Sequence, residues 1–260
     1  MLKSIWKIAM LCGAGAAAPV WAQGPADHVA MGVAANEARD PGTALEHFQA
    51  ALSQDSASYA ANWRAAMILL DRGEQTADSA KGGARDSLYA LAERCARRAV
   101  SSNPRGADGH FALAAAVGRV SLTLGQEPRI RRAGIIRNEA LRAIQLNPRH
   151  DGAYHIMGRW HAEIMRLSGI GRFFASNFLG ARVFKQASWK QAIANMEKAV
   201  ALDPGRIYHR LELARIYADR KRGADAESQL HAVESLPLRE AMDSVYKRRG
   251  AELRRRLAKH

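Results

Sequence analysis

The chain contains little cysteine: Cys12 and Cys95 are the two in 260 residues. Cys12 lies in an N-terminal apolar stretch that we predict is removed, so the mature chain keeps Cys95 alone and forms no internal disulfide. Cys95 stands in the sequence LAERCARRA, among small residues and without a local His or Asp arrangement. This setting favours a packed small side chain over a nucleophile.

Signals for strands and for catalysis are also scarce. Alternating runs of β-branched residues are missing, while Ala, Leu, Arg, Glu and Gln dominate, which predicts an all-α protein. The pattern Gly169-Ile170-Gly171 lacks the third glycine and the preceding strand of a dinucleotide loop. His155 and His161 are six residues apart, not the four of a zinc-binding helix. We therefore expect no enzyme, no metal and no cofactor.

The N-terminus has the pattern of a signal peptide. Lys3 and Lys7 precede an apolar run over residues 8–20, and Val20-Trp21-Ala22 forms a cleavage site. The run is shorter than the stretch of about 20 residues that spans a bilayer, and a retained anchor is the alternative. We expect residues 1–22 to be removed after Ala22 and the protein to be exported, to the periplasm of a Gram-negative bacterium.

Three prolines punctuate the rest of the chain. Pro104, Pro148 and Pro204 each close an Ala-rich amphipathic stretch, in the sequences SSNP, QLNP and ALDP. Proline lacks the N–H that a helix needs, so each one marks the end of a helix pair. We predict that residues 23–260 form a single α-solenoid domain. Its helix hairpins are expected near residues 25–58, 59–104, 105–148, 149–204 and 205–238, with a capping helix over 239–258.

The fourth of these hairpins carries the clearest repeat pattern. Large and small residues alternate on its two helices in a set order: Tyr154, Met157, Gly158, His161, Ala192, Met196, Ala199 and Pro204. The pattern resembles the tetratricopeptide repeat, whose small residues let two helices approach closely. The resemblance implies a solenoid of about five hairpins with insertions.

The fourth hairpin also contains a long insertion. Gly158 and Ala192 are 34 positions apart, where an ordinary repeat needs about 12. From Ile164 through Met196 there is no acidic residue. If residues 170–184 are helical, apolar side chains cover an arc of roughly 140 degrees. They are Ile170, Phe173, Phe174, Phe178, Ala181 and Phe184. Such a stripe either enlarges the core or forms the wall or lid of an apolar groove.

The chain is strongly basic, with a formal net charge of +14. Arginine suits carboxylate and phosphate groups, so an acidic partner, an anionic membrane surface or a lipid headgroup are candidate partners. An arginine-rich codon usage is the alternative explanation. Nucleic acid is not expected, because the basic clusters lack an aromatic stacking platform and an exported protein rarely meets DNA.

Several stretches together are similar to one family. They are GADGHFALAAAVGRVS, NEALRAIQLNP, AYHIMGRWHAEI, the insertion with its paired Phe, and ANMEKAVALDPGRIYHRLELARIYAD. In order and content they resemble the regulator of microtubule dynamics family of tetratricopeptide proteins, over about residues 60–258. The resemblance implies an all-α, non-enzymatic protein, linked in eukaryotes to microtubules and organelle contacts, with phospholipid binding. An exported bacterial protein does not meet tubulin, so we do not expect the microtubule role to transfer.

Two functions remain open at this stage. In the first, the protein is a non-enzymatic scaffold whose concave face binds a peptide or protein partner. In the second, an apolar groove closed by residues 166–185 binds or transfers a phospholipid or another amphiphile. The candidate groove residues are Trp63, Phe111, Met157, Trp160, Phe173, Phe174 and Phe178. The candidate anion-binding residues are Arg159, Arg166, Arg172 and Arg182.

Overall fold

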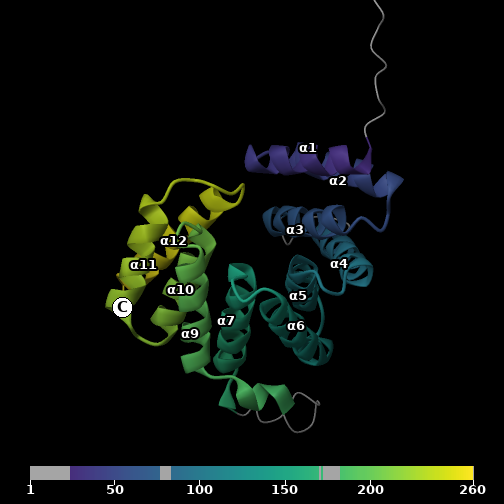
Figure 1. The fold of residues 1–260 in the computed structure, drawn as a ribbon. Helices are drawn as coiled ribbons and strands as arrows, with labels where there is room; N and C mark the ends of the chain where they lie inside the picture. Colours follow the sequence, from purple (N-terminus) through teal and green to yellow (C-terminus); the bar gives the residue numbers. More distant parts are fainter. Residues whose placement is uncertain (1–23, 77–82, 170, 172–181, 260) are drawn as a thin grey trace, which may run out of the picture.

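A computed structural model describes residues 24–76, 83–169, 171 and 182–259. In these ranges the chain forms eleven α-helices and one short 3-10 helix, and no strand. Within the same ranges, no helix is long and apolar enough to cross a bilayer. The all-α prediction is therefore confirmed, and the helices are arranged as antiparallel pairs (Figure 1).

Five helix hairpins follow one another along the chain. They are α1 (Pro25–Glu37) with α2 (Pro41–Gln54), α3 (Tyr59–Gln75) with α4 (Ala84–Ser102), α5 (Ala107–Leu122) with α6 (Gln126–Leu146), α7 (Asp151–Arg166) with α9 (Trp189–Leu202), and α10 (Ile207–Asp219) with α11 (Gly223–Ser235). A last helix, α12 (Asp243–Leu257), packs against both helices of the fifth hairpin. The prediction of a solenoid with about five hairpins and a C-terminal capping helix is confirmed.

The proline cadence has a local structural cause. Asn103, Asn147 and Asp203 each cap the C-terminus of a hairpin's second helix, directly before a proline. Each side-chain oxygen then accepts a hydrogen bond from the backbone N–H two residues further on, at 3.0–3.2 Å. The Asx turn and the proline together end one hairpin and start the next.

Small residues bring the paired helices close together, as the repeat pattern predicts. A Cβ atom on Gly158 of α7 would lie 3.0 Å from Met196 and 3.2 Å from the carbonyl oxygen of Ala192. On α9, Ala192, Met196 and Ala199 are all fully buried. A larger residue at position 158 would therefore push α9 away from α7.

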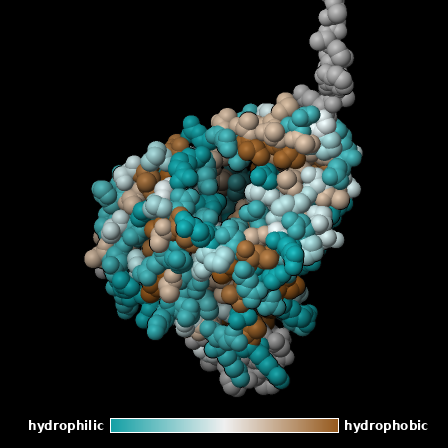
Figure 2. Space-filling view, viewed as in Figure 1, coloured by the Kyte–Doolittle hydropathy of each residue, from teal (hydrophilic) through white to brown (hydrophobic). Residues whose placement is uncertain are grey.

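The hairpins run around an arc, and its last part returns towards its first (Figure 1). The Gln75 side chain at the end of α3 lies 2.9 Å from the sulfur of Met242, which directly precedes α12. The residue before Gln75, Glu74, forms an ion pair with Arg249 between α3 and α12. The arc is thus nearly closed, and Figure 2 shows the molecule hollowed at its centre.

The described end of the insertion belongs to the core. Residues Arg182–Gln186 form the 3-10 helix η2 rather than an α-helix. Phe184 is buried and packs edge-on against Trp160, with ring centres 6.4 Å apart. Phe173, Phe174, Phe178 and Arg172 lie outside the described residues.

Candidate binding cavity

The inner helices of the arc enclose a cavity of about 980 Å³. Its wall comes mainly from α3, α5 and α7, with Tyr208 and His209 of α10; these are the first helices of four successive hairpins. The second helix α6 adds Arg129, Ile130, Ala133 and Ile136, and the end of α1, the segment 239–242, Tyr246 of α12 and Phe184 of η2 also line the cavity. The first helices of consecutive repeats therefore present their side chains to one shared space.

The cavity brings together some of the predicted site residues and not others. Those on its wall are Trp63, Phe111, Trp160, Arg159 and Arg166. Met157 is buried on another side of α7, in the core shared with α6. Arg182 is exposed on η2 and does not line the cavity.

Trp63 and Phe111 form an aromatic wall from α3 and α5. Trp63 is half-buried, and the guanidinium of Arg64 lies 4.1 Å from the centre of its ring. The Phe111 ring packs against His150 at 4.7 Å. It also covers Gly152, where a Cβ atom would come within 2.6 Å of Phe111. Both rings are held in place by their surroundings while still facing the cavity.

Trp160 has a structural role in the wall. Its side chain is buried, and its indole Nε1–H donates a hydrogen bond of 2.9 Å to the carbonyl oxygen of Ala133. Phe184 covers one edge of the ring. With its donor satisfied, Trp160 shapes the cavity and offers no free hydrogen-bonding group.

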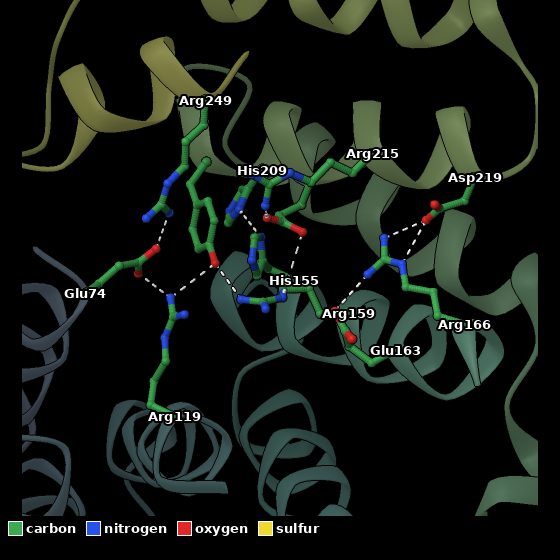
Figure 3. A network of polar contacts seen from close by, with 12 residues as sticks. Glu74, Arg119, His155, Arg159, Glu163, Arg166, His209, Arg215, Asp219 and Arg249 are labelled. Carbon is green, nitrogen blue, oxygen red and sulfur yellow. Dashed lines mark hydrogen bonds and ion pairs between the residues drawn. The ribbon is translucent and has the colours of Figure 1, made fainter. Parts of the chain in front are cut away.

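A row of ionisable residues runs along the inner face of α7. Asp151, His155, Arg159 and Glu163 are spaced four apart, which places them on one side of the helix. All four line the cavity. We call the polar seam this row, Arg166 at the end of α7, and the residues at and directly before α10 that continue its contacts, which are Arg206, His209, Glu212, Arg215 and Asp219. Figure 3 shows its part from His155 to Arg166, with His209, Arg215 and Asp219 opposite.

At one end of the polar seam, Asp151 binds His209, which in turn contacts His155. Asp151 accepts a hydrogen bond from His209 Nε2 at 2.8 Å and one from Arg206 at 2.9 Å. Burial raises the pKa of Asp151, but the bonds to His209 and the charge of Arg206 outweigh it, so the pKa lies below its ordinary value. The Nδ1 atoms of His209 and His155 lie 2.9 Å apart.

Both histidines are neutral at pH 7. Burial lowers the pKa of His155 well below 6.5, and the neighbouring cationic groups lower it further. Burial also lowers the pKa of His209, although Asp151 opposes the effect. Because His209 donates to Asp151 through Nε2, its Nδ1 must accept the proton of His155 Nδ1.

The middle of the polar seam connects four helices across the cavity. Arg159 donates a hydrogen bond of 2.5 Å to the Tyr208 hydroxyl, and Arg119 of α5 approaches the same oxygen at 3.4 Å. Arg119 also pairs with Glu74, which in turn pairs with Arg249 (Figure 3). This chain of contacts links α7, α10, α5 and α3 and continues to α12, so it holds the arc closed.

The two predicted anion-binding arginines of the wall already have carboxylate partners. Arg166 pairs with Glu163 at 2.7 Å and with Asp219 at 2.6 Å. Arg159 lies 3.8 Å from the buried Glu212. Their charges are therefore compensated within the protein, which reduces their capacity to hold a free anion.

Asp71 of α3 stands apart from these paired groups. It lines the cavity, and among the described residues it makes no hydrogen bond and no ion pair. Burial, together with the negative charges of Glu240 and Glu74, raises the pKa of Asp71 to about 7. Unlike Asp151, Glu163 and Glu240, the Asp71 carboxylate has no cation bonded to it among the described residues.

The cavity has an apolar end near η2. Leu122 at the end of α5, Leu124 two residues later and Leu167 after α7 line it, and their side chains are 37–49 % exposed. The buried side chains of Ile130 and Ile164 also line the cavity. Exposed large apolar side chains at the mouth of a cavity are a feature of ligand and partner sites.

The residues considered above for metal binding and for nucleophilic chemistry have the following places in the described part of the chain. No set of three or more His, Cys, Asp or Glu residues there could hold a metal ion. Cys95 is buried, and burial raises the pKa of its thiol, so it stays protonated at neutral pH.

Sequence reasoning missed the polar seam and Asp71. The spacing of Asp151, His155, Arg159 and Glu163 is visible in the sequence, whereas we compared His155 only with His161. The partners of these residues lie on α10, more than 50 residues away. Asp71 has no local signal, because its importance comes from what surrounds it in space.

The fold and the cavity define a tetratricopeptide-repeat protein with a nearly closed arc of hairpins. Comparison with protein families gives the more specific class. The model of the family "Regulator of microtubule dynamics protein 1-3" matches residues 26–258, so the chain belongs to that family. None of the curated proteins compared with the chain matches it significantly.

Solved structures show the same fold. TTC0263, a thermophilic tetratricopeptide protein of Thermus thermophilus, is 20% identical with a TM-score of 0.62, covering 88% of this chain and 97% of its own. PilF of Pseudomonas aeruginosa is 16% identical with a TM-score of 0.50, covering 90% of this chain and 86% of its own. At these identities the likeness establishes the fold alone.

Proposed function

We propose that this protein is a non-enzymatic scaffold that holds a segment of a protein partner inside the cavity. The observation that carries the proposal is the shared wall: four successive inner helices direct aromatic and charged side chains into one space. A volume of about 980 Å³ is at the upper end of the range of about 300–1,000 Å³ for ligand sites. Short peptide segments fit such a space.

Trp63 and Phe111 are the anchors that we assign to this function. They are aromatic, line the cavity and are held by contacts with Arg64 and with His150, which also line it. Rigid aromatic side chains at the centre of a concave surface carry a large share of binding energy. Bracing them in advance reduces the entropy that binding costs.

A peptide selection tests the proposal. Peptides are selected from a displayed random library on the purified chain, and their affinities are measured by fluorescence anisotropy. Trp63→Ala and Phe111→Ala are each expected to weaken binding about tenfold or more. Trp189→Ala is the matched control, because Trp189 is also half-buried beneath an arginine but lies outside the cavity. Equal effects of all three substitutions would contradict the assignment.

The apolar end supports a second candidate, the binding of an amphiphile. Leu122, Leu124 and Leu167 offer a surface for an acyl chain. Native mass spectrometry of the purified protein, with an organic extract analysed in parallel, tests this function. A retained amphiphile that is lost in Leu124→Glu would support it. Failure of any lipid to co-purify or to bind from detergent would exclude it.

We also propose that the protein is exported to the periplasm. The support is the sequence pattern alone: a basic start, an apolar run and the site ending at Ala22. Mass spectrometry of the protein from fractionated cells should find Gln23 as its first residue in the periplasmic fraction. An intact N-terminus in the membrane fraction would instead indicate a retained anchor.

A further inference from the structure

Two hydrogen-bond acceptors at the cavity wall have no donor among the residues that the structure describes. One is the Asp71 carboxylate, which makes no hydrogen bond or ion pair with any of them. The other is Nε2 of His155, which lines the cavity, is 5 % exposed and has no partner for this nitrogen. Buried polar groups are nearly always satisfied, so Nε2 of His155 indicates a missing donor, and the half-buried Asp71 carboxylate is open to one from the cavity.

Nε2 of His155 carries no proton of its own. Asp151 fixes the proton of His209 on Nε2, so His209 Nδ1 accepts from Nδ1–H of His155. In a neutral imidazole the second nitrogen is then a bare acceptor. Nε2 of His155 therefore requires an N–H or O–H donor, and an anionic group cannot satisfy it.

The charges around Asp71 also favour a hydrogen-bond donor, and in particular one that carries a positive charge. Glu74 has Arg119 and Arg249 as partners, and Glu240 pairs with Arg206 at 3.0 Å. Arg119, Arg249 and Arg206 are thus bonded to Glu74 and Glu240, and none of the three is bonded to Asp71. Burial and the two neighbouring carboxylates disfavour the charged form of Asp71 more than Arg119 and Arg206 favour it, so a cation bonded directly to Asp71 would be stabilised.

Aromatic rings near these acceptors suit a cation as well. Tyr208 and Tyr246 stack in parallel at 4.3 Å, and both line the cavity. Trp63 lies on the same helix as Asp71, two turns earlier. Ring faces attract ammonium and guanidinium groups, most strongly where water is excluded.

We propose that the cavity binds a hydrogen-bond-donating cation, an ammonium or guanidinium group, with Asp71 as its counter-ion. The proposal deepens the scaffold function and rests on it for one source of the cation, a lysine or arginine side chain of the partner segment. A free polyamine has the same chemistry and is the other source. The net charge of +14 favours acidic partners, so this preference is the opposite of the one that composition predicts.

Asp71 gives the site a measurable pH dependence. Its pKa of about 7 in the empty cavity means that a cation binds in competition with a proton. The charged and titratable groups that act on it come from several neighbouring elements. They are Glu74 on α3, Arg119 on α5, Arg206 directly before α10, Glu240 before α12, and Tyr246 on α12. Ionisation of Asp71 between pH 6 and 8 should strengthen binding about tenfold.

Isothermal titration of the full chain tests the proposal with three probes. They are spermidine, the peptide acetyl-Ala-Lys-Ala-amide, and the same peptide with norleucine in place of lysine. Spermidine or the lysine peptide should bind saturably at pH 8 and about tenfold more weakly at pH 6. Norleucine should remove binding. A stronger response to spermidine identifies a free polyamine as the source, and a lysine-specific response identifies a side chain.

Asp71→Asn is the decisive variant, because it keeps the shape and removes the charge. It should lose most of the affinity at pH 8 and all of the difference between the two pH values. Glu46→Gln is the matched control, since Glu46 is exposed on α2 without an ion pair among the described residues. Circular dichroism at both pH values establishes that each variant is folded.

The outcomes separate this inference from the scaffold function. If library-selected peptides bind Asp71→Asn as tightly as the unmodified chain, without pH dependence, the cation site is refuted and the scaffold stands. If spermidine binds through Asp71 while no peptide is selected, the cation site stands and the scaffold fails. Absence of Asp71-dependent binding by both cationic probes overturns the inference.

Discussion

Replacing Asp71 with asparagine should stabilise the empty protein at neutral and alkaline pH. The Asp71 carboxylate lines the cavity beside Glu74 and Glu240, and its pKa rises from 3.8 to about 7. The folded state therefore holds the Asp71 proton more tightly than the unfolded chain does. Stability that is fully present below about pH 4 is lost as the pH rises towards 7. Asparagine carries no charge and escapes this loss.

The size of the effect follows from the two pKa values. At about 1.4 kcal/mol per pH unit, the interval from 3.8 to about 7 corresponds to about 4 kcal/mol. Asp71 is only partly buried, and water in the cavity reduces the penalty. We therefore expect about 2 kcal/mol at pH 8. For a protein of this size that is a rise in Tm of roughly 4–8 °C. With these two pKa values, the gain at pH 5 should be about two fifths of the gain at pH 8.

Urea denaturation at pH 5 and pH 8 measures the two gains directly. The relevant quantity is the gain in unfolding free energy at pH 8 minus the gain at pH 5, because this difference cancels the pH-independent effect of exchanging a carboxylate oxygen for an amide nitrogen. Glu46→Gln, on the exposed side of α2, should change stability little at either pH. An equal gain for Asp71→Asn at both pH values, or a loss at pH 8, would show that the carboxylate is compensated and that its surroundings have been misread.

Two further substitutions test the closure of the arc and the aromatic wall. Glu74→Gln leaves Arg119 and Arg249 without their shared carboxylate and should lower the free energy of unfolding by about 2–3 kcal/mol. Hydrogen exchange in α12 should become faster, and unchanged exchange there would contradict our account of how the arc is closed. Gly152→Ala should cost about 1–3 kcal/mol, because its Cβ would meet Phe111 at 2.6 Å. Gly134→Ala, with no atom within 4 Å, should be neutral or stabilising by about 1 kcal/mol, and a large loss there would undermine the comparison.

The architecture was predictable because its signals are local. In each Asn-Pro or Asp-Pro pair, the first residue caps the C-terminus of a helix and the proline prevents the helix from continuing. Pro104, Pro148 and Pro204 therefore mark the ends of hairpins without any information about tertiary contacts. The small residues at 158 and 192 encode helix contact in the same way. Proline position and residue size act on the backbone directly, and both are readable from the chain.

The chemistry of the cavity was only partly predictable. Arg159 and Arg166 do line it, yet the sequence could not show that Glu212 and Asp219 would neutralise them from α10. Ion pairs between hairpins join residues that are about 50 positions apart, and no spacing rule covers such distances. The same limit explains why His155 was compared with His161 on its own helix and not with His209.

Net charge and local charge act at different ranges, and the basic composition of this chain is therefore a poor guide to the cavity. At physiological salt, exposed charges are screened beyond about 8 Å, so the +14 of the chain governs encounter and orientation at the surface. Inside the cavity the arginines Arg119, Arg159 and Arg206 are bound to carboxylates or to Tyr208. Arg64 and Arg129 also line the cavity without an ion pair among the described residues, so the negative charge that favours a cation is local to the unpaired Asp71. The basic surface would thus attract a partner through the partner's acidic groups, whereas Asp71 in the cavity would select it through a cationic group.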